Sequence, residues 1–231
     1  MLIIEKKPGI VSAEHNGSVP KDMYKFNKIR TEKTPLWKLC MDYIGAALCL
    51  IVFSPVMLAV ALAIKIADGG PVMFKQVRIG KGGRPFTMYK FSSMVPDAEE
   101  KKQSLMELNE RDYPAFKMKN DPRITPVGKF IRKWSLDELP QFINVLKGEM
   151  SLVGPRPNVI EEVAQYEDWY YDRLKIRPGI TGLWQATSRD RNSFEEWMSL
   201  DITYVKTYSP LLDVKILLLT IPTVLSAKGS S

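Results

Sequence analysis

The chain has 231 residues, enough for one domain of ordinary size with a hydrophobic core and some appended segments. Lys and Arg outnumber Asp and Glu by 33 to 26, and the formal net charge of +7 favours an anionic partner: phosphate, nucleic acid or an anionic lipid surface. Cys40 and Cys49 both fall in the most apolar stretch and His15 lies in a polar tail, which excludes disulfide frameworks, cysteine metal sites and histidine-dependent catalysis.

The N-terminal region divides into a tail and a membrane segment. Residues 1–35 mix Lys, Gly, Pro, Asn and Ser without apolar periodicity, which predicts a loosely ordered basic tail that lacks the features of a secretory signal. Within residues 36–68, the stretch from Tyr43 to Ile64 carries no charge and predicts a membrane helix. A buried core helix is the alternative, although such helices rarely stay apolar on every face for this length.

Ser54 and Pro55 interrupt the middle of the membrane segment. Proline removes a backbone hydrogen bond and clashes with the preceding turn, so a kink or break is expected there. Each half would be about 18 Å long, against a hydrocarbon core of roughly 30 Å. We therefore expect a re-entrant hairpin that turns at Ser54-Pro55, with Lys38, Lys65 and Lys75 drawn to the cytoplasmic side. A kinked spanning helix is the alternative.

After the membrane segment the pattern changes to short alternating runs on either side of Gly80 to Gly83, which predicts a basic β-hairpin. These glycines lack the Gly-Lys-Ser/Thr ending of a P-loop, so a turn is favoured over a nucleotide cradle. Residues 97–120 are charged and helix-prone.

The segment Ser135-Leu136-Asp137-Glu138-Leu139-Pro140 opens an apolar helix that is expected to end at Gly148. One interpretation of its acidic residues is structural, because Ser135 and Glu138 have the spacing of a capping box. Pro140 argues for a helix start nearer Asp137.

The other interpretation is a phosphate site. A helix N-terminus favours anions, Arg132 and Lys133 lie just upstream, and Arg156 follows between two stiffening prolines. Paired carboxylates beside cations can bind Mg²⁺ and a diphosphate together, and an aspartate can itself attack phosphorus. Phosphoryl transfer is therefore the expected reaction class.

The motifs WSLDELPQFINVLKGEMSLVGPRP and RPGITGLWQ closely resemble the bacterial sugar transferase family of monotopic phosphoglycosyl transferases. The resemblance covers roughly residues 36–226 and includes the Ser-Pro break, the Gln76-Val77-Arg78 and Tyr89-Lys90-Phe91 regions and a Leu-Asp-Val-Lys near the C-terminus. It implies a mixed α/β fold, mostly helical with short strands, as a monotopic domain with a re-entrant helix and interfacial amphipathic helices. The catalytic domain would span residues 69–226, ahead of a short tail at 227–231.

The resemblance also implies a mechanism. Asp137 would attack the sugar-bearing phosphate of a UDP-sugar, release UMP and form a phosphosugar-aspartyl intermediate, which polyprenyl (undecaprenyl) phosphate would then attack. Glu138 would assist this dyad, Mg²⁺ with Asp137 as ligand would neutralise the diphosphate, and Arg132 and Arg156 would bind phosphate. Such an enzyme would act at the cytoplasmic face of the bacterial inner membrane, in the first membrane step of a surface glycan pathway, and homo-oligomers are compatible with the resemblance.

The same resemblance makes Lys90, Arg177, Gln185 and Arg189 candidate substrate-binding residues, with structural hydrogen bonding as an equal alternative for the last three. The chain departs from the family pattern at Ser92 and over Gln185 to Arg189, which concerns substrate contacts rather than the reaction.

Aromatic and apolar residues near the C-terminus suit a membrane boundary. Trp169, Tyr170 and Tyr171 fit the membrane–water interface or, equally, an ordinary core. Residues 211–228 predict an apolar helix in the interface or under the domain. The rival functions are a non-catalytic membrane scaffold and a basic nucleic-acid-binding protein; no nucleic-acid partner is expected, because no binding motif is recognisable.

Overall fold

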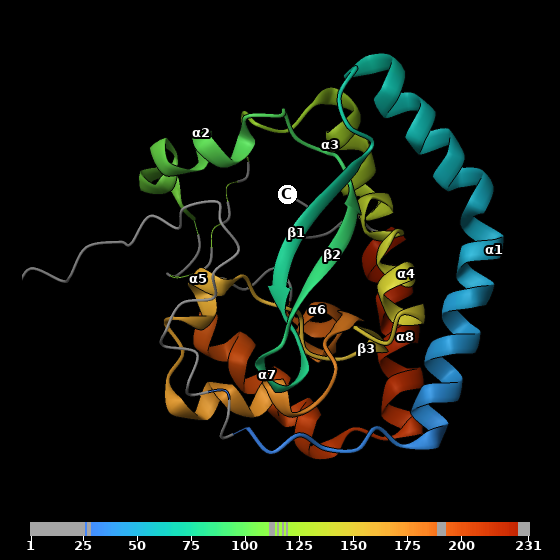
Figure 1. The fold of residues 1–231 in the computed structure, drawn as a ribbon, viewed down its shortest axis with the longest axis vertical. Helices are drawn as coiled ribbons and strands as arrows, with labels where there is room; N and C mark the ends of the chain where they lie inside the picture. Colours follow the sequence, from blue (N-terminus) through green and yellow to red (C-terminus); the bar gives the residue numbers. More distant parts are fainter. Residues whose placement is uncertain are drawn as a thin grey trace, which may run out of the picture.

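The computed structural model describes residues 26, 29–110, 114, 116, 118, 120–188 and 193–225, which form a mostly helical fold with two small sheets (Figure 1). This confirms the predicted mixture of helices and short strands. The α-helices are α1 (Leu36–Ala67), α2 (Ala98–Ser104), α3 (Pro126–Lys133), α4 (Gln141–Leu146), α5 (Ile160–Val163), α6 (Leu183–Thr187), α7 (Phe194–Thr207) and α8 (Pro210–Leu225). The strands are β1 (Met73–Ile79), β2 (Pro85–Phe91), β3 (Ser151–Val153) and β4 (Gly179–Thr181), and the 3₁₀ helices are η2 (Lys81–Gly83), η3 (Met106–Leu108), η4 (Leu136–Glu138) and η5 (Asp168–Lys175).

Helix α1 runs through Pro55 without a break and bends along one side of the molecule (Figure 1). Pro55 has no N–H to donate to the carbonyl of Ile51, four residues earlier. The hydroxyl of Ser54 donates to that carbonyl instead, at 2.8 Å. This local bond explains how the helix continues. The two halves form one bent helix and do not fold back on each other.

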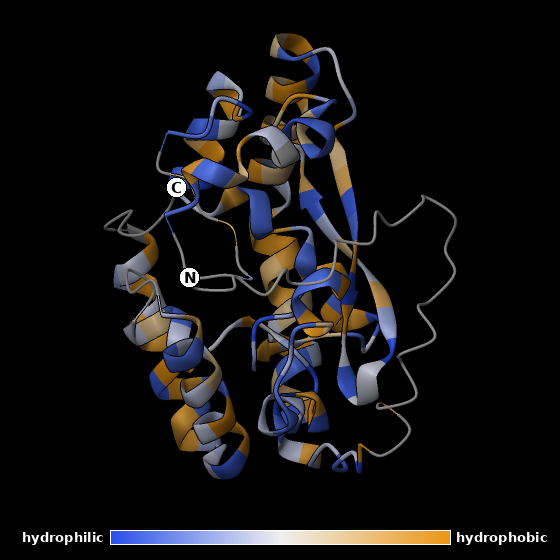
Figure 2. Cartoon of the chain, turned by 90° about the vertical axis from the view of Figure 1, so that its left-hand side faces the viewer, coloured by the Kyte–Doolittle hydropathy of each residue, from blue (hydrophilic) through white to orange (hydrophobic). Residues whose placement is uncertain are grey.

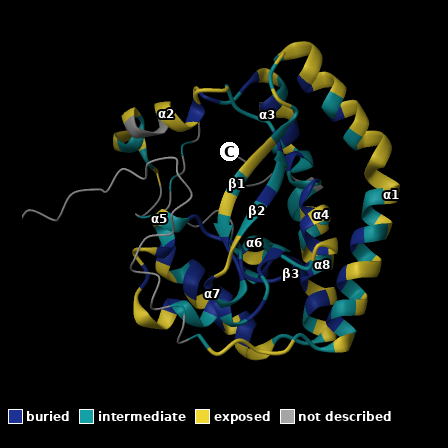
Figure 3. Cartoon of the chain, in the orientation of Figure 1, coloured by how far each residue is buried: buried dark blue, intermediate teal, exposed yellow. Residues whose placement is uncertain are grey.

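Most of α1 is exposed and apolar (Figure 3). It is the helix in the described part of the chain that is long and apolar enough to cross a membrane, and only 11% of its most apolar window is buried. The alternative of a buried core helix is therefore wrong. Most other helices carry hydrophilic and hydrophobic residues together, as the mixed colours in Figure 2 show.

The first turn of α1 contacts the rest of the domain through the buried ammonium of Lys38. The ammonium of Lys38 donates to the carboxylate of Asp213 on α8 at 2.6 Å, to the Val153 carbonyl at 2.9 Å and to the Tyr204 hydroxyl at 3.1 Å. Tyr204 in turn donates to Asp213 at 2.6 Å. The side chains of Lys38 and Asp213 are 3% and 0% exposed, so the charge of each depends on the other.

Two further contacts hold the helix at each end. One turn beyond Lys38, the carboxylate of Asp42 accepts hydrogen bonds from the Ser151 hydroxyl at 2.8 Å and the backbone N–H of Leu152 at 2.9 Å. At the other end, Asp68 accepts from the Thr125 hydroxyl at 3.0 Å, and Ile64 packs in a buried cluster with α3 and β2. Both ends of α1 therefore contact the same domain.

The predicted hairpin is present. Strands β1 and β2 pair in antiparallel register from Met73–Phe91 to Ile79–Pro85. Their turn contains Gly82 and Gly83 at positive φ, where glycine is the residue of lowest cost, so the glycines serve the turn and not a P-loop. The predicted helical character of residues 97–120 is confirmed for the first half by α2 and η3, whereas the residues that the structure describes between 109 and 120 are not helical.

In the part of the chain that the structure describes, the core consists of three hydrophobic clusters, of which the largest lies at the second sheet. Strands β3 and β4 pair in parallel and contact α8, while the largest cluster joins residues of α1, α4, β3, α7 and α8. Another cluster contains five buried aromatic residues and includes Tyr170, which is 7% exposed and packs edge-to-face on Tyr166 and Phe194. Core packing is thus the correct interpretation for Tyr170, whereas Trp169 is 40% exposed.

Removal of Asp213 is expected to destabilise the protein strongly. Asp213→Ala leaves the ammonium of Lys38 buried without its carboxylate, a loss of about 3 to 5 kcal/mol. Thermal unfolding of the detergent-solubilised protein measures it. Asp97→Ala, which breaks the exposed Asp97–Lys101 pair, is the matched control and should leave the midpoint unchanged. Equal midpoints for the two variants would contradict a structural role for the buried pair.

Candidate active site

The Asp137-Glu138 dyad lies in a tight turn between α3 and α4. After α3, Ser135 has a φ of 54°, a left-handed backbone conformation that residues other than glycine rarely adopt. The 3₁₀ helix η4 begins at the next residue. Ser135 makes no side-chain cap hydrogen bond and α4 begins only at Gln141, so the capping-box interpretation is wrong. The predicted stop at Gly148 is confirmed by its φ of 74°. The dyad therefore owes its position to a reversed backbone turn and not to the first turn of a long helix.

Two cations clamp one member of the dyad. The Oε1 atom of Glu138 lies 2.8 Å from the ammonium of Lys90 on β2 and 3.3 Å from the Nη1 atom of Arg156. Asp137 Oδ2 is 3.9 Å from the same ammonium, outside hydrogen-bond distance. Glu138 thus holds the two cations in place beside Asp137. Asp137 itself is buried, with 8% of its surface exposed.

The electrostatic surroundings of Asp137 act in opposite directions. Burial raises the pKa of its carboxyl, Lys90 lowers this pKa, Glu138 raises it, and Arg132 and Arg156 lower it. Burial also lowers the pKa of the Lys90 ammonium, against the opposing effect of Glu138. A carboxylate of raised basicity among cations is suited to attack an electrophile that itself carries negative charge.

The dyad opens into a cavity of about 300 Å³. Its charged lining consists of five cationic side chains and four acidic ones: Arg78, Lys90, Arg123, Arg132, Arg156, Glu99, Asp137, Glu138 and Glu162. A slight excess of positive charge around a buried dyad favours an anionic ligand. Because Asp137, Glu138, Arg132, Arg156 and Lys90 all line this cavity, the structure brings the predicted catalytic and phosphate-binding residues together. The positive charge comes from side chains, since α4 is too short to contribute much of a dipole.

Sequence reasoning gave no role to two of the cavity's arginines. Arg78 bonds Gln76 Oε1 through Nε at 3.0 Å and through Nη2 at 2.6 Å, and donates from Nη1 to the Pro157 carbonyl at 2.9 Å. Burial lowers the pKa of Arg78 to about 10. Arg123 forms a fork on Asp121, at 2.9 and 2.6 Å. Strand alternation could have identified Arg78, because it places Phe74, Gln76 and Arg78 on the same face of β1, the one that lines the cavity.

A buried arginine supports the Pro-Arg-Pro loop. Arg173 on η5 donates to the backbone carbonyl of Arg156 at 2.6 Å, forms an ion pair with Asp201 on α7 and bonds Asn158 and Tyr166. The side chains of Arg173 and Asp201 are 1% and 2% exposed. Burial raises the pKa of Asp201 to about 6, against the opposing effect of Arg173. The pair fixes the backbone that presents the Arg156 guanidinium to Glu138.

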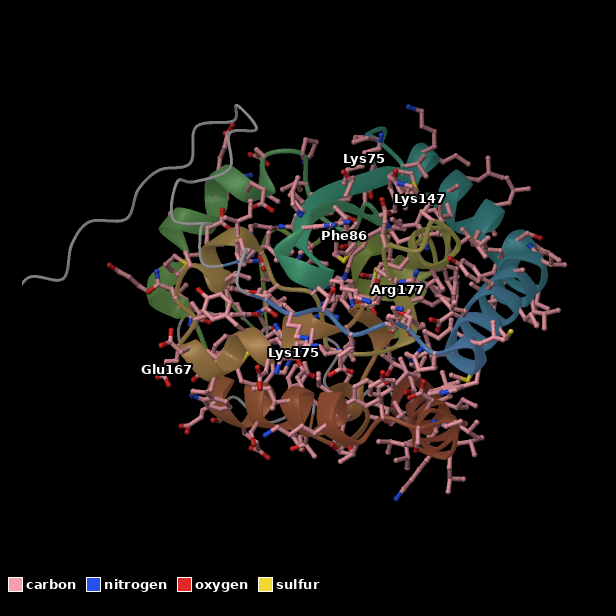
Figure 4. The ribbon with its side chains drawn as sticks, turned by 60° about the horizontal axis from the view of Figure 1, so that its bottom comes forward. Lys75, Phe86, Lys147, Glu167, Lys175 and Arg177 are labelled. Atoms are coloured by element: carbon pink, nitrogen blue, oxygen red, sulfur yellow. The ribbon has the colours of Figure 1, made fainter. Side chains whose placement is uncertain are left out.

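The remaining predicted substrate contacts lie elsewhere. Gln185 donates to the Ile180 carbonyl at 2.9 Å, and neither it nor Arg177 lines the cavity. Arg177 lies by the end of α4 (Figure 4), where a Cβ added to Gly148 would be 3.4 Å from its Nη2 atom. The hydrogen bond favours the structural alternative for Gln185, whereas Arg177, whose Nη1 atom is buried without a hydrogen-bond partner among the described residues, is assigned to neither alternative. Arg189 lies outside the described residues.

The donor set can be tested against Mg²⁺. Among the residues that the structure describes, no group of three or more His, Cys, Asp or Glu side chains is arranged to hold a metal ion. Mg²⁺ rarely needs one, because it is commonly bound by one or two carboxylates together with substrate phosphates and water. Asp137 and Glu138 supply adjacent carboxylates in the cavity, which fits an ion brought in with a diphosphate.

Comparison with known proteins reveals similarity along most of the chain. A family model described as "Bacterial sugar transferase" matches residues 33–227. The chain is 46% identical over 194 residues to the galactosyl transferase CpsE of Streptococcus agalactiae, covering 84% of this chain and 43% of that protein. It is 39% identical over 197 residues to the exopolysaccharide production protein ExoY of Rhizobium meliloti, covering 84% and 87%.

The name of a third relative includes undecaprenyl phosphate. The undecaprenyl-phosphate galactose phosphotransferase of Salmonella typhimurium is 41% identical over 212 residues, which cover 88% of this chain and 44% of that protein. The chain therefore spans less than half the length of this relative and of CpsE, but most of the length of ExoY.

Loss of the buried Arg173–Asp201 pair is expected to loosen the Pro-Arg-Pro loop. In Asp201→Asn the carboxylate that orients Arg173 becomes a neutral amide, so the bond from Arg173 to the Arg156 carbonyl weakens. Hydrogen–deuterium exchange of peptides covering residues 154–159 should rise about tenfold. Asp172→Asn, which breaks the surface pair with Lys175, is the control. Unchanged exchange in Asp201→Asn would show that the loop is held by other contacts.

Proposed function

The chain belongs to the bacterial sugar transferase family, and from this premise we propose that it transfers a sugar-1-phosphate from a UDP-sugar to polyprenyl phosphate and releases UMP. The observation that carries the proposal is the buried Asp137 beside Glu138 in a cavity with five cationic side chains. The names of the relatives, among them an undecaprenyl-phosphate galactose phosphotransferase, support the class of acceptor.

The reaction proceeds in two steps that both pass through Asp137. In the first, a carboxylate oxygen of Asp137 attacks the phosphorus that bears the sugar, the bond from that phosphorus to the UMP oxygen breaks, and UMP leaves. In the second, a phosphate oxygen of the polyprenyl phosphate attacks the same phosphorus, and the bond to Asp137 breaks. Each step forms one P–O bond and breaks one, so the carboxylate is regenerated.

The neighbouring side chains divide the remaining work. Lys90 and Arg156, held by Glu138, and Arg132 stabilise negative charge that develops on the phosphoryl oxygens. Asp137, with Glu138 beside it, would hold Mg²⁺, which supplies charge neutralisation on the diphosphate. The clamp on Glu138 keeps the cations close to Asp137 without a short ion pair to the attacking carboxylate itself.

The placement of α1 supports a monotopic enzyme at the cytoplasmic face of the inner membrane. Both ends of the helix contact the catalytic domain, through Lys38 and Asp42 at the start and through Ile64 and Asp68 at the end. A helix with both ends on one polar domain enters the bilayer from one side and returns to it. This placement would keep the catalytic cavity near the membrane surface, which suits a site that joins a water-soluble donor to a lipid phosphate.

Asp137→Asn is expected to abolish turnover. The amide is close to isosteric but is no nucleophile, so UMP release with polyprenyl phosphate present should fall at least 1000-fold for every member of a UDP-sugar panel. The panel also identifies the sugar. Glu149→Gln, a change of a carboxylate that pairs with Lys147 and does not line the cavity, should retain activity. Near-normal turnover by Asp137→Asn would leave a membrane scaffold as the better interpretation.

Arg132→Ala is expected to slow turnover substantially. If Arg132 stabilises charge on the transferring phosphoryl group, its removal raises the barrier by about 2 to 4 kcal/mol, which is read as a lower kcat/KM. The neighbouring Lys133 is exposed and does not line the cavity, so Lys133→Ala is the matched control. An effect of Arg132→Ala within about twofold of the control would remove Arg132 from the mechanism.

Cysteine labelling is expected to place both flanks of α1 on the cytoplasmic side. Thr31→Cys and Gly70→Cys are made separately in a Cys40→Ser/Cys49→Ser background; Gly69 is avoided because its φ is +66°. A membrane-impermeant thiol reagent should label neither position in intact cells and both after permeabilisation. Labelling of position 31 from outside would establish a spanning helix.

A further inference from the structure

A second cavity adjoins the catalytic cavity. It has a volume of about 390 Å³ and lies between the end of α1, the start of β1 and the segments around residues 92–96 and 124–126. Phe74, Ser92 and Met94 line both cavities, so the two spaces share a rim. A ligand that filled one could continue into the other past these three residues.

The chemistry of the two cavities differs. The second one is lined mainly by apolar side chains: Ile64, Pro71, Met73, Phe74, Met94, Val95, Pro96, Ile124 and Pro126. Its charged members are Asp68, which accepts a hydrogen bond from Thr125, and the exposed Lys75. The catalytic cavity has nine charged side chains in its lining. The pair of cavities therefore matches a ligand with one phosphate end and one hydrocarbon end.

The second cavity also lies at the C-terminal end of α1, beside the exposed apolar residues of that helix. Ile64 belongs to the lining, and Leu62 and Ile66 on the neighbouring turns are 54% and 83% exposed. Figure 4 shows Lys75 on the hairpin near the end of α1 that leads into it. With α1 in the bilayer, as proposed above, the cavity adjoins the apolar surface that this helix presents to lipid.

We propose that the second cavity is the acceptor groove: it holds the isoprene units nearest the phosphate of the polyprenyl phosphate, whose phosphate passes Phe74, Ser92 and Met94 toward Asp137. The inference rests on the proposed function and adds the location of its lipid substrate. The acceptor enters from the end of α1, and the charged part of the catalytic cavity serves the nucleotide sugar. An exposed lysine, Lys75, stands at the groove where a lipid phosphate would pass.

An apolar groove of limited size predicts how KM depends on the chain length of the acceptor. Each isoprene unit that enters an apolar groove adds buried hydrocarbon, so KM should fall with chain length until the groove is full and then level off. Met73→Gln and Ile124→Gln place an amide in the groove and should flatten this dependence, raising KM about tenfold for the long acceptors. Val77→Gln is the matched control, because Val77 is on the same strand, is 49% exposed and lines neither cavity.

The experiment compares these three variants with the unchanged protein, using polyprenyl phosphates of two to eleven isoprene units. UMP release in the absence of any acceptor is measured in parallel and should be the same in all. Overlapping chain-length curves for Met73→Gln, Ile124→Gln and Val77→Gln would refute the groove. Absence of UMP release by the unchanged protein with every acceptor would instead refute the proposed function.

A photo-crosslinking measurement on the unchanged protein does not depend on the variants folding. A polyprenyl phosphate with a diazirine in its first isoprene unit should label peptides that contain residues 73–75, 92–96 or 124–126. Labelling confined to the exposed middle of α1, around residues 44–58, would place the acceptor on the outside of the helix and overturn the proposal.

Discussion

The arrangement of this protein depends on one buried ion pair between residues 175 positions apart, Lys38 and Asp213. Lys38 opens a helix whose following residues are almost all apolar, and an ammonium in that position is costly unless a carboxylate is built around it. Asp213, Tyr204 and the Val153 carbonyl provide that environment. Helix α1 is consequently fixed to the same elements, β3, α7 and α8, that form the core of the domain.

A second buried ion pair, between Arg173 and Asp201, positions the active site as the first pair positions α1. Arg173 and Asp201 fix the backbone of Arg156, and Arg156 with Lys90 fixes Glu138. The charges that surround Asp137 are thus set by side chains whose own positions are fixed from the core outward, which is the preorganisation that charge stabilisation in a transition state requires. Because the chain of contacts runs from α7 to β2, the site is built from elements distant in sequence.

The parts that sequence predicts well are those with a local physical cause. Strand alternation around Gly82 and Gly83 gave the hairpin, and Gly148 gave the end of α4. The identities of Asp137, Glu138, Arg132 and Arg156 followed from motifs and spacing, and the structure places all four around one cavity. What spacing could not give is the left-handed turn at Ser135, since nothing in its neighbours requires a positive φ.

The features that sequence did not predict arise from contacts between distant residues. No local pattern pairs Arg173 with Asp201, and no pattern separates Gln185, which bonds a neighbouring strand, from a substrate ligand. The continuous course of α1 past Pro55 depends on the bond from the Ser54 hydroxyl to the Ile51 carbonyl, which a Ser-Pro pair permits but does not require. The central claim that remains is that Asp137 is a nucleophile and not only a charge. Protein incubated with its UDP-sugar and Mg²⁺, without lipid, should release at most one UMP per active site, and peptide mass spectrometry should find the phosphosugar on Asp137. UMP release only with polyprenyl phosphate present, and no trapped adduct, would contradict the account and favour direct transfer.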